Sequence, residues 1–121
     1  MSKDRYLWEI LVPATTNAGK KISVGHHRIW DAKIRAISGG LTLMPVAKGQ
    51  WQHEGFLFKE RTIPVRVLAT RREIETILDI MLEHYSDQIA VLAYKISEEA
   101  ILKYREGKLK GDSNSFIHAK M

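Results

Sequence analysis

The chain has 121 residues, 45% hydrophobic and 27% charged, values typical of one globular domain. It contains no cysteine, which excludes disulfides, thiolate nucleophiles and cysteine-ligated zinc sites. No apolar run approaches the roughly 20 residues of a membrane span, and the first residues lead straight into a strand pattern rather than a signal peptide. The net charge of +5 permits a nucleic-acid partner without requiring one. We expect a cytoplasmic protein.

The first third of the chain predicts a strand followed by a helix. Residues 6–12 alternate aromatic and branched side chains, with apolar residues on both faces, and predict a buried strand that Pro13 ends. Ser23 is expected to cap a helix over residues 24–37. The glycine at position 39 is expected to stop that helix.

The middle of the chain predicts short strands. Residues 41–44 form one candidate, and residues 50–52 and 55–58 flank a turn at His53-Glu54-Gly55. Residues 63–69 alternate clearly and predict a further strand. Because proline cannot donate a ladder hydrogen bond, Pro64 is expected at an edge or at the strand's start.

The second helix has the strongest periodicity in the sequence. Thr70 and Glu73 form a capping box before residues 71–85. Apolar side chains follow at helical spacing: Ile74, Ile77, Leu78, Met81, Leu82 and Tyr85. Residues 88–96 then predict an apolar strand, and Ser97 can cap a short last helix over residues 98–105.

This order predicts an α+β fold of the ferredoxin-like βαββαβ type, an antiparallel sheet with two helices on one face and a short C-terminal helix. We expect a single domain over residues 1–107 and a basic, polar tail over residues 108–121. The sheet's other face must also be covered. Trp8, Trp51 and Tyr94 suggest that another subunit covers it, giving a homo-oligomer.

Few motifs point to chemistry on their own. His26 and His27 are adjacent and diverge on a helix, so they do not favour a metal site. No glycine pattern forms a nucleotide-phosphate loop, and no serine lies in a nucleophile elbow. The basic residues are scattered, which is typical of a solvated surface. Glu60 lies between Lys59 and Arg61; it is either a surface ion-pair partner or a carboxylate that orients a cationic substrate.

Two resemblances meet at these residues. The first is to a group of small uncharacterised bacterial ferredoxin-like proteins and carries the fold alone. Its segments are residues 9–13, 39–42, 49–51, Gly55 and residues 89–92. Over roughly residues 6–107 the chain also resembles the phage S-adenosylmethionine lyases. Those matching segments are Ile10-Leu11-Val12, His26-His27-Arg28, Ile34-Arg35-Ala36, Gly49-Gln50-Trp51, Glu60-Arg61-Thr62, Val65-Arg66-Val67 and Val91-Leu92-Ala93-Tyr94-Lys95.

The second resemblance implies a specific activity. Those lyases are homotrimers with sites between subunits, and they convert S-adenosylmethionine into 5′-methylthioadenosine and homoserine lactone without a metal or an organic cofactor. The family's glutamate falls on Glu60, the predicted catalytic residue. Its aromatic residue falls on Trp51, where the lyases carry tyrosine. We predict that Trp51, Arg66 and His26 bind the substrate, and that a phage-encoded enzyme acts against restriction in the host cytoplasm.

Two other functions remain open at this stage. The chain resembles a lyase, but the same intersubunit pocket would serve a non-catalytic protein that sequesters a small molecule such as a nucleotide signal. The basic surplus suits such an anionic ligand better than a cationic one. A basic nucleic-acid-binding accessory protein is the third alternative, although the predicted strands lack the aromatic set of an RNA-binding sheet.

Overall fold

The computed structural model describes residues 4–105. Its elements in chain order are β1 (Tyr6–Pro13), α1 (Val24–Ser38), β2 (Thr42–Leu43), β3 (Ala47–His53), β4 (Phe56–Ala69), α2 (Arg71–His84) and β5 (Ala93–Ser97). The expected ferredoxin-like α+β class is confirmed. Within the described residues the sheet has five strands, one more than the βαββαβ plan contains. The additional strand is β2, expected over residues 41–44; both β2 and β3 pair with β4.

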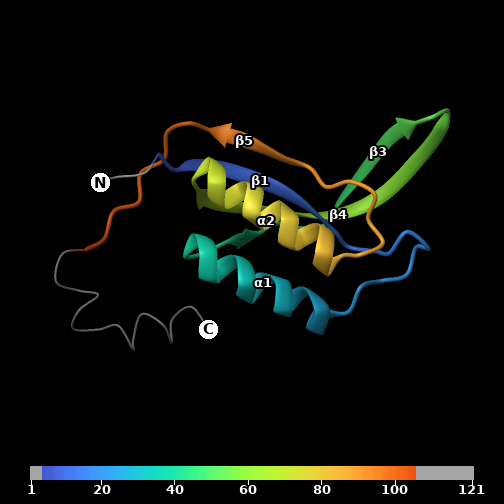
Figure 1. The fold of residues 1–121 in the computed structure, drawn as a ribbon, viewed down its shortest axis with the longest axis horizontal. Coiled ribbons are helices and arrows are strands. Elements are labelled where there is room, and N and C mark those ends of the chain that lie inside the picture. The colour runs from blue at the N-terminus through green and yellow to red at the C-terminus, as the bar shows by residue number, and fades with distance from the viewer. Residues whose placement is uncertain (1–3, 106–121) are drawn as a thin grey trace.

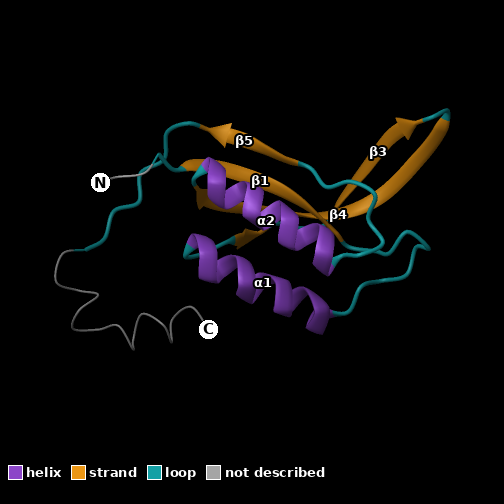
Figure 2. Ribbon diagram, in the orientation of Figure 1, coloured by secondary structure: helices purple, strands orange, loops and turns teal. Residues whose placement is uncertain are grey.

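The molecule has two layers. The antiparallel sheet runs in the order β2-β4-β1-β5, with β3 also pairing with β4. Both helices lie side by side on the same face of this sheet (Figure 1). Figure 2 shows that residues 4–105 place no helix on the opposite face. We call that opposite surface the open face.

The longest strand joins two segments that the sequence predicts as separate strands. Residues 55–58 and 63–69 are expected as two strands, but β4 runs unbroken over Phe56–Ala69. Its second half pairs with β1 in the sheet, and its first half pairs with β3 in a hairpin that projects from the body (Figure 1). We call this hairpin, β3 with residues 56–62, the arm. The arm exists because the polar residues 59–61 continue the strand instead of ending it.

Pro64 lies inside β4 and not at its start, yet the reason for the expectation still holds. Its carbonyl accepts a hydrogen bond from the Met44 amide at 2.9 Å, on the side away from β1. A residue's nitrogen and carbonyl point to the same side of a strand, so the missing N–H also faces away from β1. On that side Pro64 lies between the two strands that pair with β4: the pairing with β3 ends at Ala47–Thr62, and the pairing with β2 starts at Leu43–Val65. No ladder bond to β1 is therefore lost.

The core lies between the helices and one face of the sheet. Its buried side chains include Trp8, Ile10, Val12, Val65, Val67 and Ala69 from the sheet and Trp30, Ile34, Ile74, Ile77 and Met81 from the helices. The expectation that Trp8 lies on the sheet's other face is therefore wrong, because Trp8 shares the helix-covered face with Ile10 and Val12. Each large side chain buried in this way contributes about 1.5–3 kcal/mol. The apolar stripe predicted for α2 is thus confirmed over most of its length. Leu82, at the margin of that stripe, is 41% exposed.

The predicted helix ends are confirmed. The Ser23 hydroxyl accepts a hydrogen bond from the His26 amide, and Gly39 ends α1 with φ +90°. Such a left-handed cap suits glycine because no Cβ is present. Thr70 and Glu73 form the reciprocal capping box of α2.

The C-terminal part differs from the prediction. The strand expected over residues 88–96 starts only at Ala93, and Ile89 is 69% exposed. The helix expected over residues 98–105 is absent; Ser97 only closes a turn with Glu99. A helix this short needs packing for stability, and Ile101 is 86% exposed. The predicted tail, residues 108–121, lies outside the described residues. No described helix is long and apolar enough to cross a membrane.

Candidate functional site

A cleft of about 590 Å³ separates the arm from the body of the molecule. One wall is the arm, with Gly49, Trp51, Phe58 and Glu60. The other walls are the end of β1, the loop over residues 15–19 and the segment over residues 88–92. We call this space the arm cleft. Its size suits a ligand of about the size of a nucleoside derivative.

The arm wall carries a stacked aromatic pair. A tight turn at Glu54 and Gly55, with φ of +51° and +81°, sets the hairpin register so that Trp51 faces Phe58. Their ring centroids lie 4.5 Å apart with an interplanar angle of 16°. The pair presents a flat aromatic surface to the cleft, suited to a planar ring or to a cation.

Glu60 lies on the same face of the arm, opposite Gly49 in the strand pairing. A Cβ built on Gly49 would meet the Glu60 Cγ at 3.8 Å, so the glycine leaves the space beside this carboxylate open. Glu60 is half-buried, and no ion pair among residues 4–105 involves it. The cleft therefore combines an aromatic surface with a carboxylate.

The remaining walls are of two kinds. Thr15 and Thr16 bring hydroxyl groups from the loop after β1, whereas Ile89, Val91 and Leu92 form an apolar wall. This second wall is held in place because the Leu11 amide donates to the Leu92 carbonyl at 3.0 Å. The arrangement fits an amphipathic ligand, with apolar surface on one side and polar groups on the other.

Arg66, a predicted substrate-binding residue, does not line the arm cleft in a single chain. It lies on the open face, where its Nε donates to the Glu9 carboxylate at 2.9 Å. Tyr94 donates to the same carboxylate from β5. The Tyr94 hydrogen bond, followed by the Arg66 bond and charge, lowers the pKa of Glu9 although burial opposes this. Glu9 in turn raises the pKa of Tyr94.

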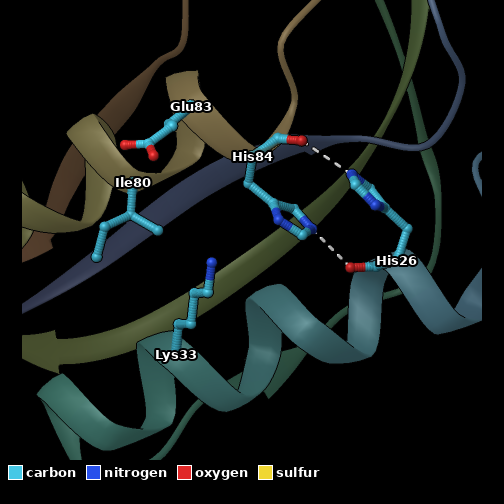
Figure 3. Close-up of a pocket in the computed structure, with 5 residues that line it drawn as sticks. All are labelled: His26, Lys33, Ile80, Glu83 and His84. Atoms are coloured by element: carbon cyan, nitrogen blue, oxygen red, sulfur yellow. Dashed lines mark hydrogen bonds between the residues drawn. The ribbon is translucent and has the colours of Figure 1, made fainter.

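His26, also predicted to bind substrate, lies in a different place. It borders a second hollow of about 490 Å³ between the two helices, with His84, Lys33, Glu83 and Ile80 (Figure 3). Of the four predicted site residues, the arm cleft thus brings together Glu60 and Trp51. Their roles, and those of Arg66 and His26, remain predictions.

Sequence analysis missed several residues that the structure places with the predicted ones. Phe58, Gly49 and residues 88–92 border the arm cleft, and His84 contacts His26. The first two had a signal in the sequence. A two-residue turn at Glu54-Gly55 fixes a register in which positions 51 and 58, and positions 49 and 60, face each other. The other contacts depend on tertiary packing alone.

No group of three or more histidine, aspartate or glutamate side chains within residues 4–105 is arranged to hold a metal ion. The arm cleft has a single carboxylate, Glu60, and the basic residues Lys59 and Arg61 are also in its lining, so the charge that a divalent cation requires is not assembled there. The chemistry available there is electrostatic stabilisation and orientation of a bound molecule.

Comparison with known proteins gives the fold and no closer relationship. No family model matches the chain, and no curated protein matches it in sequence. Among solved structures, the chain is similar to the divalent cation tolerance protein Cut A1 from Thermus thermophilus, with TM-score 0.55 and 11% identity, covering 88% of this chain and 92% of that one. CutA from Xylella fastidiosa gives TM-score 0.56 and 10% identity, with 98% of each chain covered.

A phage SAM lyase solved with S-methyl-5′-thioadenosine is also similar, with TM-score 0.53 and 12% identity, covering 80% of this chain and 92% of that one. The lyase-like fold expected from the sequence is therefore confirmed. Several CutA proteins share this fold as well, which the sequence analysis did not anticipate. At these identities the likeness extends to the fold alone.

Proposed function

We propose that this chain cleaves S-adenosylmethionine to 5′-methylthioadenosine and homoserine lactone, with the arm cleft as its binding site. The observation that carries the proposal is the grouping of Trp51, Phe58 and Glu60 on one face of the arm, bordering a cleft of about 590 Å³. The solved phage SAM lyase with this fold supports it.

The substrate's chemistry matches these groups. S-adenosylmethionine carries a positively charged sulfonium and an aromatic adenine. An aromatic face attracts a cation by about 0.5–2 kcal/mol, and the same face can stack with a purine. Trp51 lacks the hydroxyl of a tyrosine, so it acts here through its ring and not through a hydrogen bond from an oxygen.

The reaction needs little covalent help from the protein. The substrate's carboxylate oxygen attacks its own γ-carbon; a C–O bond forms, the C–S bond breaks, and the sulfonium leaves as a neutral thioether. No proton or electron is transferred. Since two opposite charges disappear, a site that folds the substrate and excludes water favours the step. The apolar side chains of Ile89, Val91 and Leu92 line the cleft, and a neighbouring subunit would cover them and exclude the remaining water.

Glu60 is the proposed catalytic residue. Its carboxylate, half-buried beside Gly49 and without an ion-pair partner in the described part of the chain, is available to the substrate's ammonium or ribose. That contact would hold the substrate in the folded geometry that the attack requires. Preorganised electrostatic contacts of this kind contribute about 3–4 kcal/mol to a transition state.

The proposal includes an oligomer, with three subunits as the resemblance implies. The open face carries Leu7, Leu11, Pro64 and Leu68, which are only half-buried in a single chain. Contact with another subunit would bury them and would complete the arm cleft from outside. We place the reaction in the cytoplasm, where a phage-encoded enzyme would deprive host restriction and methylation of their cofactor.

A second candidate is a protein that binds a small molecule without cleaving it. The net charge of +5 favours an anionic ligand such as a nucleotide, and the aromatic pair would stack with its base as well as with adenine. In this case Glu60 and Trp51 contact the ligand and no product forms.

Incubation with S-adenosylmethionine followed by chromatography separates the two candidates. Accumulation of 5′-methylthioadenosine together with homoserine lactone supports the lyase. Binding of S-adenosylmethionine or a nucleotide without product, measured by calorimetry, supports the sequestering protein.

A further inference from the structure

A pair of histidines joins the two helices at one end (Figure 3). His26 lies in the first turn of α1, and His84 is the last residue of α2. The Nε2 of His26 lies 2.9 Å from the carbonyl oxygen of His84, and the Nε2 of His84 lies 2.7 Å from the carbonyl oxygen of His26. Carbonyl oxygens only accept, so each Nε2 donates a hydrogen bond to the other residue's backbone.

The two imidazole rings also stack. Their centroids lie 3.8 Å apart with an interplanar angle of 15°. The ring of Tyr85 meets both of them edge-on, and its hydroxyl oxygen lies 2.7 Å from the Nδ1 of His27. Two neutral imidazole rings can stack at this distance, whereas two imidazolium rings repel each other because they carry the same charge.

The charged groups around the pair do not cancel that repulsion. From α1 come His27, Asp31 and Lys33, and from the end of α2 come Glu83 and Tyr85. Lys33 adds a positive charge, whereas Asp31 and Glu83 offset part of it. Burial lowers the pKa of His84, whereas its hydrogen bond to the His26 carbonyl raises it. The positive charges of His26 and Lys33 lower the pKa further. Burial likewise lowers the pKa of His27.

The histidine pair lies where two walls of the arm cleft attach to the helices. Residues 14–22 lead into α1, and residues 85–92 leave α2. The two segments also touch: the Asn17 amide donates to the Asp87 carboxylate at 2.7 Å, and the Gln88 side chain donates to Asn17 at 3.3 Å. Movement of the helix ends would therefore be passed to both walls.

We propose that His26 and His84 form a pH-sensitive clasp that holds these two walls together near neutral pH and releases them in acid. The regulatory consequence rests on the proposed function, since it concerns the ligand site in the arm cleft. When folding lowers the pKa of a histidine, the free energy of unfolding depends on pH. The contribution of that histidine is fully present above its ordinary pKa of about 6.5. That contribution is lost as the pH falls through the lower, folded pKa.

Histidine titration by NMR on the ligand-free protein tests the electrostatic part. We expect the pKa of His84 to lie below its ordinary value, and the pKa of His84 in the His26→Gln variant to lie closer to it, because the neighbouring positive charge is gone. The exposed His53 serves as the internal control for the comparison of the two proteins. Ordinary, independent titration of His84 in the wild type would overturn the clasp.

Amide hydrogen exchange tests the mechanical part. After correction for intrinsic rates, the protection of the Ile22 and Gln88 amides should fall about tenfold between about pH 7.5 and pH 5. Amides in the β1–β4 ladder should keep theirs. His84→Gln can still donate to a carbonyl but cannot titrate, so it should abolish the fall; His53→Gln should retain it. An equal fall in His84→Gln would refute the proposal. All measurements omit ligand, so failure of the lyase reaction leaves this test intact.

Discussion

Glu60 lies across the arm from Gly49, and its Cγ would sit 3.8 Å from a Cβ at that glycine. This distance is ordinary van der Waals contact, so one methyl group fits beside Glu60 while a longer side chain must extend into the arm cleft. Gly49 has an ordinary φ, so the backbone does not require glycine there; its small size keeps the Glu60 carboxylate accessible.

Gly49→Leu should therefore close the site without harming the fold. We expect the affinity for 5′-methylthioadenosine, the proposed product, to fall by at least about tenfold when measured by calorimetry, which corresponds to about 1.4 kcal/mol. Gly49→Ala is the matched control and should bind as the wild type does. Wild-type affinity in the leucine variant would place the ligand elsewhere.

Ile77→Asp should unfold the domain. Ile77 is fully buried in α2, and an unpaired charge there costs more than about 4 kcal/mol. Leu82→Asp, on the same helix but 41% exposed, should cost less than about 1 kcal/mol. Urea titrations followed by circular dichroism measure both. Similar stability in the two variants would show that α2 packs through another face.

The buried carboxylate of Glu9 should influence acid stability. Glu9 is 9% exposed, and its hydrogen bonds from Tyr94 and Arg66 lower its pKa. A carboxylate with a lowered folded pKa stabilises the protein above its unfolded pKa of about 4.3, and that stability is lost as the pH falls through the folded value.

Glu9→Gln should thus lower the free energy of unfolding near neutral pH by about 1–3 kcal/mol and flatten its decline below about pH 4. Glu75→Gln, which removes an exposed ion pair with Arg71, should change it by less than about 1 kcal/mol. Thermal unfolding across the pH range provides the comparison. A decline in Glu9→Gln as steep as that of the wild type would assign acid unfolding to other groups.

The open face should be an interface between copies of the chain. Light scattering at micromolar concentration should give the mass of three chains for the wild type. Leu68→Lys, which puts a charge beside Leu7 on this face, should give single chains, whereas Arg28→Glu on the exposed side of α1 should not. A single-chain mass for the wild type would remove the intersubunit part of the proposed function.

The local patterns of the sequence predicted the helices well. The capping box at Thr70 and the spacing of Ile74, Ile77 and Met81 determine where α2 begins and which side is buried. These are interactions between residues three or four positions apart, so the sequence alone contains them. The strand pattern of β1 was equally clear.

Patterns failed where the structure depends on distant contacts. Only residues 50–52 of β3 were predicted as a strand, because Ala47 and Gly49 add little apolar surface to the alternation that Trp51 ends, and the arm projects from the body and buries little. Residues 88–92 have the composition of a buried strand, yet Ile89 is exposed since β1 supplies only one hydrogen bond, at Leu92, before β5 starts. The partners of Arg66 and His26 lie 57 and 58 residues away along the chain.

The candidate site was predictable only in part. Glu60 and Trp51 share the arm cleft because hairpin pairing brings them to one face, and the turn at Glu54-Gly55 encodes that pairing. The walls formed by residues 15–19 and 88–92 come together through contacts between loops, such as Asn17 with Asp87. No periodic pattern specifies such contacts.

The most direct test of the proposed function is the rate of 5′-methylthioadenosine formation by the wild type and by Glu60→Gln, measured side by side by chromatography. Glutamine keeps the shape and removes the charge, so turnover should fall roughly a hundredfold to a thousandfold with an unchanged melting temperature. Glu54→Gln, at the exposed turn of the same hairpin, should retain wild-type turnover. Equal rates in wild type and Glu60→Gln, or no product from the wild type, would contradict the assignment of Glu60 as the catalytic residue of a lyase.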